Sequence, residues 1–157
     1  MRATTAFRIR AARTTSFAAA VGLSLLCPAL AVGQTDGGTL QTVAKQPFGQ
    51  YLADAHGRAV YMFTSDHPGT STCYKSCAEA WPPLQALGPP PAGNGVSAAL
   101  LGTARRQDGS SQITYNGMPL YYFVGDHGPG TTAGAGVKGM GGEWYLVSPN
   151  GQKIDND

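Results

Sequence analysis

Hydrophobic and polar positions alternate along two separate stretches of the chain, and each stretch is interrupted by a turn signal. Residues 50–63 read QYLADAHGRAVYMF, two short runs around the turn DAHG. Residues 111–123 read SQITYNGMPLYYF, with the same layout around Asn116-Gly117. Alternation with a period of two indicates strands, and Asn-Gly is the strongest short hairpin signal. The pattern therefore predicts two β-hairpins.

The two hairpins are copies of each other at an offset of 60 residues. The matching pairs are Gly57 and Gly117, Tyr61 and Tyr121, Phe63 and Phe123, Asp66 and Asp126, and His67 and His127. In a strand, residues two positions apart point to the same face, so each copy offers a Tyr and a Phe to one side. A single hairpin is marginally stable, whereas two packed hairpins can share a core.

One short helix is expected after the first copy. Ser76 and Glu79 have the spacing of a capping box, which predicts a helix near 77–81 that two prolines then stop. A tryptophan follows each copy, at Trp81 and at Trp144. The predicted fold class is all-β, with short antiparallel strands and hairpins, two tandem pseudo-symmetric repeats in one domain, and this one helix.

Composition divides the chain into segments. The predicted division is a signal peptide at 1–31, a flexible lead-in at 32–46, and one β domain at 47–157 made of repeat one (48–88), a connector rich in Gly and Pro (89–99) and repeat two (100–151).

The first segment has the three-part layout of a secretory signal peptide. A head with four arginines and no acid precedes the apolar run SFAAAVGLSLLC, and cleavage is expected near Ala31. The run is short for a bilayer span, so no membrane span is expected in the mature chain, which would be periplasmic or secreted. Lipid anchoring at Cys27 is the alternative, but the bulky Leu26 stands where lipoprotein processing needs a small residue.

Removal of the signal peptide changes the charge of the protein. The whole chain has a formal net charge of +2, whereas the remainder keeps seven basic and nine acidic side chains, a net charge of −2. A basic surface for nucleic acid is therefore not expected.

Two cysteines, Cys73 and Cys77, remain in the exported part. In an oxidising compartment they predict one disulfide, a local staple that fixes a loop. The alternative is a redox pair, but redox motifs have two intervening residues and this pair has three.

Together these motifs resemble a family of bacterial secreted-repeat proteins, predicted lipoproteins that share a Tyr-x4-Asp motif. The matching text covers residues 49–151 and includes YLADAHGRAVYMFTSD, CYKSCAEAWPPL, RQDGSSQITYNGMPLYYFVGD and GGEWYLVSPNG. The resemblance implies an exported, two-repeat domain of the cell envelope whose biochemical activity is not established.

The repeated motif supplies most of the candidate site residues: Tyr61, Phe63, Asp66, Tyr121, Phe123 and Asp126, with Trp81 and Trp144. Aromatic residues at strand spacing favour a core, and a ligand groove is the alternative. Buried tyrosine hydroxyls need hydrogen-bond partners, which Asp66 or Asp126 could supply. The motif would then be a structural clasp.

The Asp-His pairs are the best candidates for a metal site. If the two turns meet, Asp66, His67, Asp126 and His127 would suit zinc or copper. The simpler alternative is that each Asp accepts backbone N–H bonds and shapes the following loop. No cofactor is predicted.

The predicted function is a non-catalytic binding or structural module, with an unknown envelope protein or surface component as its partner. The sequence contains no nucleophile elbow, zinc-protease helix or haem-attachment motif, so we expect no enzyme. Two alternatives remain: a periplasmic metal-binding protein that uses the Asp-His turns, and an enzyme that uses Asp66 and Asp126 as a carboxylate pair.

Overall fold

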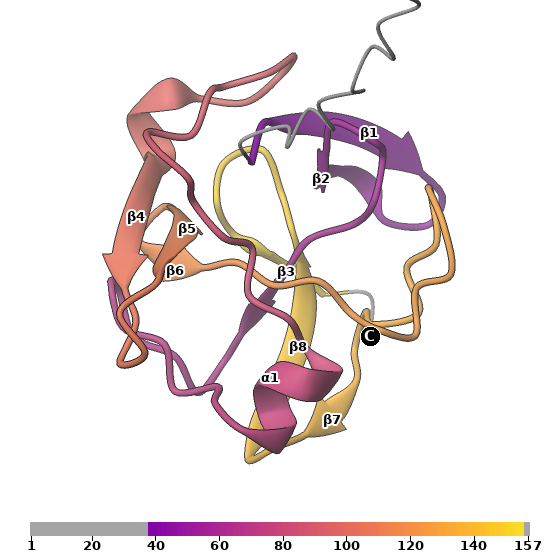
Figure 1. Cartoon of the computed structure of the whole chain (residues 1–157). Helices are drawn as coiled ribbons and strands as arrows, with labels where there is room; N and C mark the ends of the chain where they lie inside the picture. Colours follow the sequence, from indigo (N-terminus) through magenta and orange to yellow (C-terminus); the bar gives the residue numbers. More distant parts are fainter. Residues whose placement is uncertain (1–37, 156–157) are drawn as a thin grey trace, which may run out of the picture. The chain divides into compact units, whose positions relative to one another are not determined.

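A computed structural model describes residues 38–155 (Figure 1). The predicted signal peptide, its predicted cleavage point near Ala31 and the alternative lipid-anchor residue Cys27 lie outside these residues. The described elements are β1 (Leu40–Lys45), β2 (Gly49–Asp54), β3 (Tyr61–Phe63), α1 (Ser76–Ala80), the short 3-10 helix η1 (Ala98–Leu100), β4 (Leu101–Arg105), β5 (Ser111–Tyr115), β6 (Met118–Pro119), β7 (Lys138–Gly139), β8 (Gly142–Val147) and β9 (Lys153–Ile154).

These strands pair antiparallel in three small sheets. β1 pairs with β2, β8 lies between β3 and β7 and also pairs with β9, and the third sheet has the order β4-β5-β6. This confirms the predicted class, mostly short antiparallel strands with one short α-helix. Within the described range, no helix has the length and apolar character needed to cross a membrane.

The two predicted hairpins differ in the extent of pairing between their strands. The second is a true hairpin, because Asn116 (φ 49°) and Gly117 (φ 80°) adopt the positive φ that a tight turn between β5 and β6 requires. The first is joined only by a bridge between Ala53 and Ala59, because β3 continues into a ladder with β8.

The predicted flexible lead-in at 32–46 is wrong over residues 40–45, which form β1. All six residues of β1 pair with β2, and the side chain of Leu40 is fully buried. The polar composition of residues 40–45 gave no signal for a strand. Strand β1 is stabilised by its pairing with β2 and by the buried Leu40 rather than by an apolar pattern of its own.

The predicted capping box at Ser76 and Glu79 is also wrong. Helix α1 begins one residue early, and the residue at its N-cap is Lys75, at φ 53° and without a side-chain capping bond. The start of α1 lies inside the loop closed by the disulfide between Cys73 and Cys77, and the chain enters the helix through Lys75 rather than through a serine cap.

The two repeats meet at their motif tyrosines and exchange partners there. Tyr61 and Tyr121 form an antiparallel bridge with two backbone hydrogen bonds, of 2.9 and 3.0 Å. The chain after Tyr61 then pairs with β8 of repeat two, where Phe63 lies opposite Trp144. The chain after Tyr121 pairs with repeat one, because Tyr122 N–H donates to the Pro82 carbonyl. Each half thus completes the other.

The two motif segments that meet at Tyr61 and Tyr121 lie between two hydrophobic clusters. One contains the motif aromatics with Trp81 and Trp144. The other contains Val60 and Leu120, the residues that precede the two motif tyrosines, packed with Leu40, Leu52, Met62, Leu84, Ile113, Tyr115, Tyr145 and Val147. The alternation in each motif therefore assigns neighbouring residues to opposite clusters, as expected for strands.

Candidate functional site

The repeated tyrosines and aspartates bond to each other across the two repeats. The Tyr61 hydroxyl donates to Asp126 Oδ2 at 2.6 Å, and the Tyr121 hydroxyl donates to Asp66 Oδ2, also at 2.6 Å. Each tyrosine therefore uses the aspartate of the other copy. We call these two hydrogen bonds the clasp.

The second oxygen of each aspartate holds the loop that follows it. Asp66 Oδ1 accepts from the backbone N–H of Thr72 at 2.7 Å and from its hydroxyl at 2.9 Å. Asp126 Oδ1 accepts from the backbone N–H of Ala133 at 2.8 Å. Both carboxylates thus do what the simpler sequence interpretation described, in addition to joining the repeats.

Four aromatic rings stack beside the clasp, alternating between the repeats. Phe63 lies on Trp144 (centroids 4.2 Å apart), Trp144 on Trp81 (3.9 Å) and Trp81 on Phe123 (4.2 Å). Tyr61 meets Trp81 edge to face, and Tyr121 meets Trp144 in the same way. Aromatic contacts of this kind contribute about 0.5–1.5 kcal/mol each beyond the area they bury.

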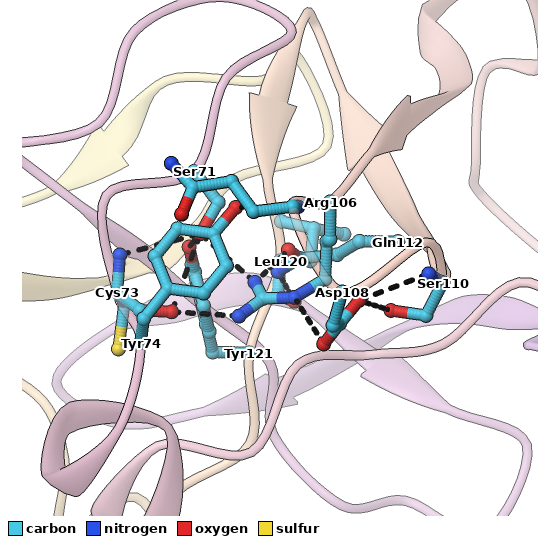
Figure 2. Close-up of polar contacts among 10 residues, drawn as sticks. Ser71, Cys73, Tyr74, Arg106, Asp108, Ser110, Gln112, Leu120 and Tyr121 are labelled. Atoms are coloured by element: carbon cyan, nitrogen blue, oxygen red, sulfur yellow. Dashed lines mark hydrogen bonds and ion pairs between the residues drawn. The ribbon is translucent and has the colours of Figure 1, made fainter.

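One half of the clasp extends into a buried network around Arg106 (Figure 2). The Arg106 guanidinium donates to Ser71 Oγ (2.8 Å), Gln112 Oε1 (2.6 Å) and the Cys73 carbonyl (2.7 Å). Ser71 Oγ lies 2.7 Å from Tyr121 Oη, which links the network to Asp66. A buried cation and a buried carboxylate are therefore connected through two hydroxyl groups.

Burial shifts the pKa values of three of the four clasp residues. It raises the pKa of the Asp66 carboxyl above the ordinary 3.8, and hydrogen bonds from Tyr121 and Thr72 and the charge of Arg106 offset only part of this effect. Burial and the neighbouring carboxylates also raise the pKa values of the Tyr61 and Tyr121 hydroxyls above 10, so both stay protonated donors at neutral pH.

Sequence reasoning did not identify Arg106 as a site residue. The available signal was alternation, because Arg106 lies two positions after the buried Ala104 and so continues the buried face of β4. Its Nε makes no hydrogen bond within the described part of the chain and lies 3.7 Å from Asp108 Oδ2.

The predicted disulfide is formed between Cys73 and Cys77, whose Cα atoms are 5.2 Å apart. Arg106 binds the carbonyl of Cys73, so the stapled loop is also fastened to repeat two.

The shared metal site predicted from the Asp-His turns is not formed. Over residues 38–155, no three His, Cys, Asp or Glu side chains are grouped so that they could hold a metal ion. His67 and His127 are exposed, whereas the aspartates beside them turn inward to the clasp. The two halves of each Asp-His pair therefore point to different environments.

The other half of the clasp borders a cavity of about 270 Å³. Its lining residues are Arg58, Ala59, Pro82, Tyr122, Phe123, Val124 and Asp126. Arg58 Nε donates to Asp54 Oδ2 at 2.7 Å, and its guanidinium lies 4.3 Å from the centre of the Tyr122 ring. We call this space the repeat-two cavity. A wider depression of about 620 Å³ lies elsewhere, lined by residues that include Leu87, Ala98 and Thr103.

A family described as a secreted repeat of unknown function matches the chain twice, at residues 42–85 and 102–148. Comparison with curated proteins and with solved structures gives no significant match. The two matched segments contain Tyr61 and Tyr121, which form the bridge between the repeats. Because the two matches cover more than half of the sequence, the chain belongs to this family of secreted repeats.

Proposed function

We propose that this protein is an exported module of the bacterial cell envelope, in the periplasm or outside the cell, that acts by binding or structural support and catalyses no reaction. The observation that carries the proposal is the clasp: all four tyrosines and aspartates of the repeated motif are used in hydrogen bonds between the repeats. The motif thus serves to join two halves into one scaffold. The expected partner is an envelope protein or surface component.

The carboxylates are poorly placed for acid–base catalysis. Asp66 is only 4% exposed and is surrounded by Tyr121 and Thr72, so a substrate has no direct access to it. Asp126 is partly exposed but shares its oxygens with Tyr61 and Ala133. This supports a binding or structural role over an enzyme with a carboxylate pair.

The proposal is tested by co-sedimentation of the purified protein with envelope fragments from the bacterium that encodes it. We expect saturable association that persists in the Asp66→Asn/Asp126→Asn double variant, compared per folded molecule, because asparagine keeps an acceptor oxygen for each tyrosine. Tryptophan fluorescence reports the folded fraction, since Trp81 and Trp144 are buried.

Two outcomes would contradict the proposal. One is the absence of saturable association with every envelope fraction. The other is a chemical change in the envelope material, detected by mass spectrometry, that the native protein produces and the folded double variant does not. Elemental analysis of the same samples tests the metal-binding alternative, which requires a stoichiometric metal that is lost in the double variant.

A further inference from the structure

We infer that the repeat-two cavity binds a small zwitterion with an apolar body, of the chemical class of an apolar α-amino acid. The inference deepens the binding role proposed above and rests on it. It starts from a difference between two copies of one motif and is then carried by the charges that line the cavity.

The same motif is closed in repeat one and open in repeat two. Phe63 is 1% exposed and Asp66 is 4% exposed, so the repeat-one end of the aromatic stack is sealed. Phe123 and Asp126 are both partly exposed, and both line the repeat-two cavity. The stack of four rings therefore ends in a space that a ligand can enter at one end only.

The floor of the cavity is apolar and held in place. The Phe123 ring stacks on Trp81, with the ring centres 4.2 Å apart, and Pro82 also lines the cavity. Val124 N–H donates to the Ala80 carbonyl at 3.1 Å, which fixes the backbone of this wall. Yet the Val124 side chain is 56% exposed, an unusual state for a large apolar residue in this protein. A bound apolar group would cover it without rearrangement of the walls.

Two opposite charges line this cavity. Each Asp126 oxygen accepts one hydrogen bond, from Tyr61 or from Ala133, and each has room for another. Within residues 38–155, no cation forms an ion pair with Asp126. Arg58 also lines the cavity; Asp54 accepts from its Nε at 2.7 Å, and the Arg58 side chain is 51% exposed.

A ligand that matches this lining carries both charges itself. A simple cation would be attracted by Asp126 but repelled by Arg58, and a simple anion would meet the reverse arrangement. An ammonium placed at Asp126 and a carboxylate placed at Arg58 satisfy both, with an apolar side chain on Phe123 and Val124. The cavity lies just below the range of about 300–1,000 Å³ typical of drug-sized ligands, which suits a molecule as small as an amino acid.

The test is calorimetric titration of the protein, purified from cells that express the full chain, with L-phenylalanine and two relatives that each lack one charge. Phenylalanine amide lacks the carboxylate and N-acetylphenylalanine lacks the ammonium. We expect phenylalanine to bind about tenfold more tightly than either relative, because each loses one charge-assisted contact. No binding of phenylalanine, or equal binding of all three, would overturn the inference.

Two tryptophan variants test whether phenylalanine binds in the repeat-two cavity. Val124→Trp fills the cavity from an exposed position and should abolish phenylalanine binding. Leu87→Trp is the matched control, because Leu87 is 70% exposed and lines the other depression. Loss of binding in Leu87→Trp with retention in Val124→Trp would overturn the assignment. A protein that fails to bind phenylalanine but still associates with envelopes would contradict this inference alone, whereas phenylalanine binding without envelope association would contradict only the envelope role.

Discussion

Repeat one and repeat two carry the same motif, but the two ends of the clasp lie in different surroundings. Asp66 accepts hydrogen bonds from Thr72 in the loop at residues 71–73, and Arg106 binds this loop at Ser71 and at the Cys73 carbonyl. Asp126 is followed by a glycine-rich loop that gives it one backbone N–H, from Ala133, and leaves it partly exposed. The Tyr–Asp hydrogen bonds are therefore alike at the two ends of the clasp. The exposure of the two aspartates differs because the loops that follow them differ.

The largest expected effect compares the two aspartates directly. Asp66→Ala removes the carboxylate that accepts three hydrogen bonds at a buried site, one from the Tyr121 hydroxyl and two from Thr72, so the free energy of unfolding should fall by about 3–5 kcal/mol. Asp126→Ala removes two hydrogen bonds at a partly exposed site and should lower it by about 1–2 kcal/mol.

Urea denaturation followed by tryptophan fluorescence measures both values. Equal losses for the two variants would show that burial does not distinguish the two ends of the clasp. An equal slope of free energy against urea for both variants would confirm that the difference lies in stability rather than in the compactness of the unfolded chain.

The second prediction concerns the crossed pairing of the motif. Tyr121→Phe should cost about 2 kcal/mol, because its hydroxyl has two close partners, Asp66 at 2.6 Å and Ser71 at 2.7 Å. Tyr61→Phe should cost about 1 kcal/mol, because its hydroxyl has one close partner, the partly exposed Asp126, and accepts only a longer bond of 3.3 Å from Gly134 N–H. Double-mutant cycles should give a coupling energy of about 1 kcal/mol for Tyr61 with Asp126. The matched control pairs Tyr61 with Asp66 of its own repeat, where the coupling should be near zero.

Coupling of Tyr61 to Asp66 instead would mean that each repeat closes on itself in solution. The crossed arrangement, and with it the exchange of strands between repeats, would then be wrong.

Local patterns predicted the elements of this fold but not their partners. The Asn116-Gly117 turn, the presence of a short helix before Pro82 and the Cys73–Cys77 disulfide follow from short stretches of sequence, because each depends on neighbouring residues. The pairing between the repeats at Tyr61 and Tyr121 does not follow from local sequence. An offset of 60 residues shows that two copies exist, but it does not show which residues of one copy contact the other. Strand β1 was missed for the same reason, because pairing with β2 rather than its own composition stabilises it.

The residues of the candidate site also divide into those with a sequence signal and those that depend on contacts between distant segments. Tyr61 and Asp126 were identifiable because repetition marks both residues. Arg106 and the repeat-two cavity occur only once and depend on contacts between distant segments: Arg106 reaches Ser71 across 35 positions, and Arg58 lines one cavity with Val124. A single sequence contains no local signal for such contacts, apart from the alternation that places Arg106 on a buried face.

The smallest expected effect is a pH dependence confined to the buried end. Because burial raises the pKa of Asp66 in the folded protein above 3.8, the folded state keeps a proton that the unfolded state releases as the pH rises past that value. The contribution of Asp66 to the free energy of unfolding should therefore fall as the pH rises from about 3.8 to the folded pKa and stay constant above it. Asp66→Asn cannot titrate at this position, so the difference in stability, native protein minus variant, should decrease across this window in urea titrations at constant ionic strength. A difference that grows with pH would mean that the hydrogen bonds from Tyr121 and Thr72, with the charge of Arg106, outweigh burial, and the closed end would then be stabilised by the charge of Asp66.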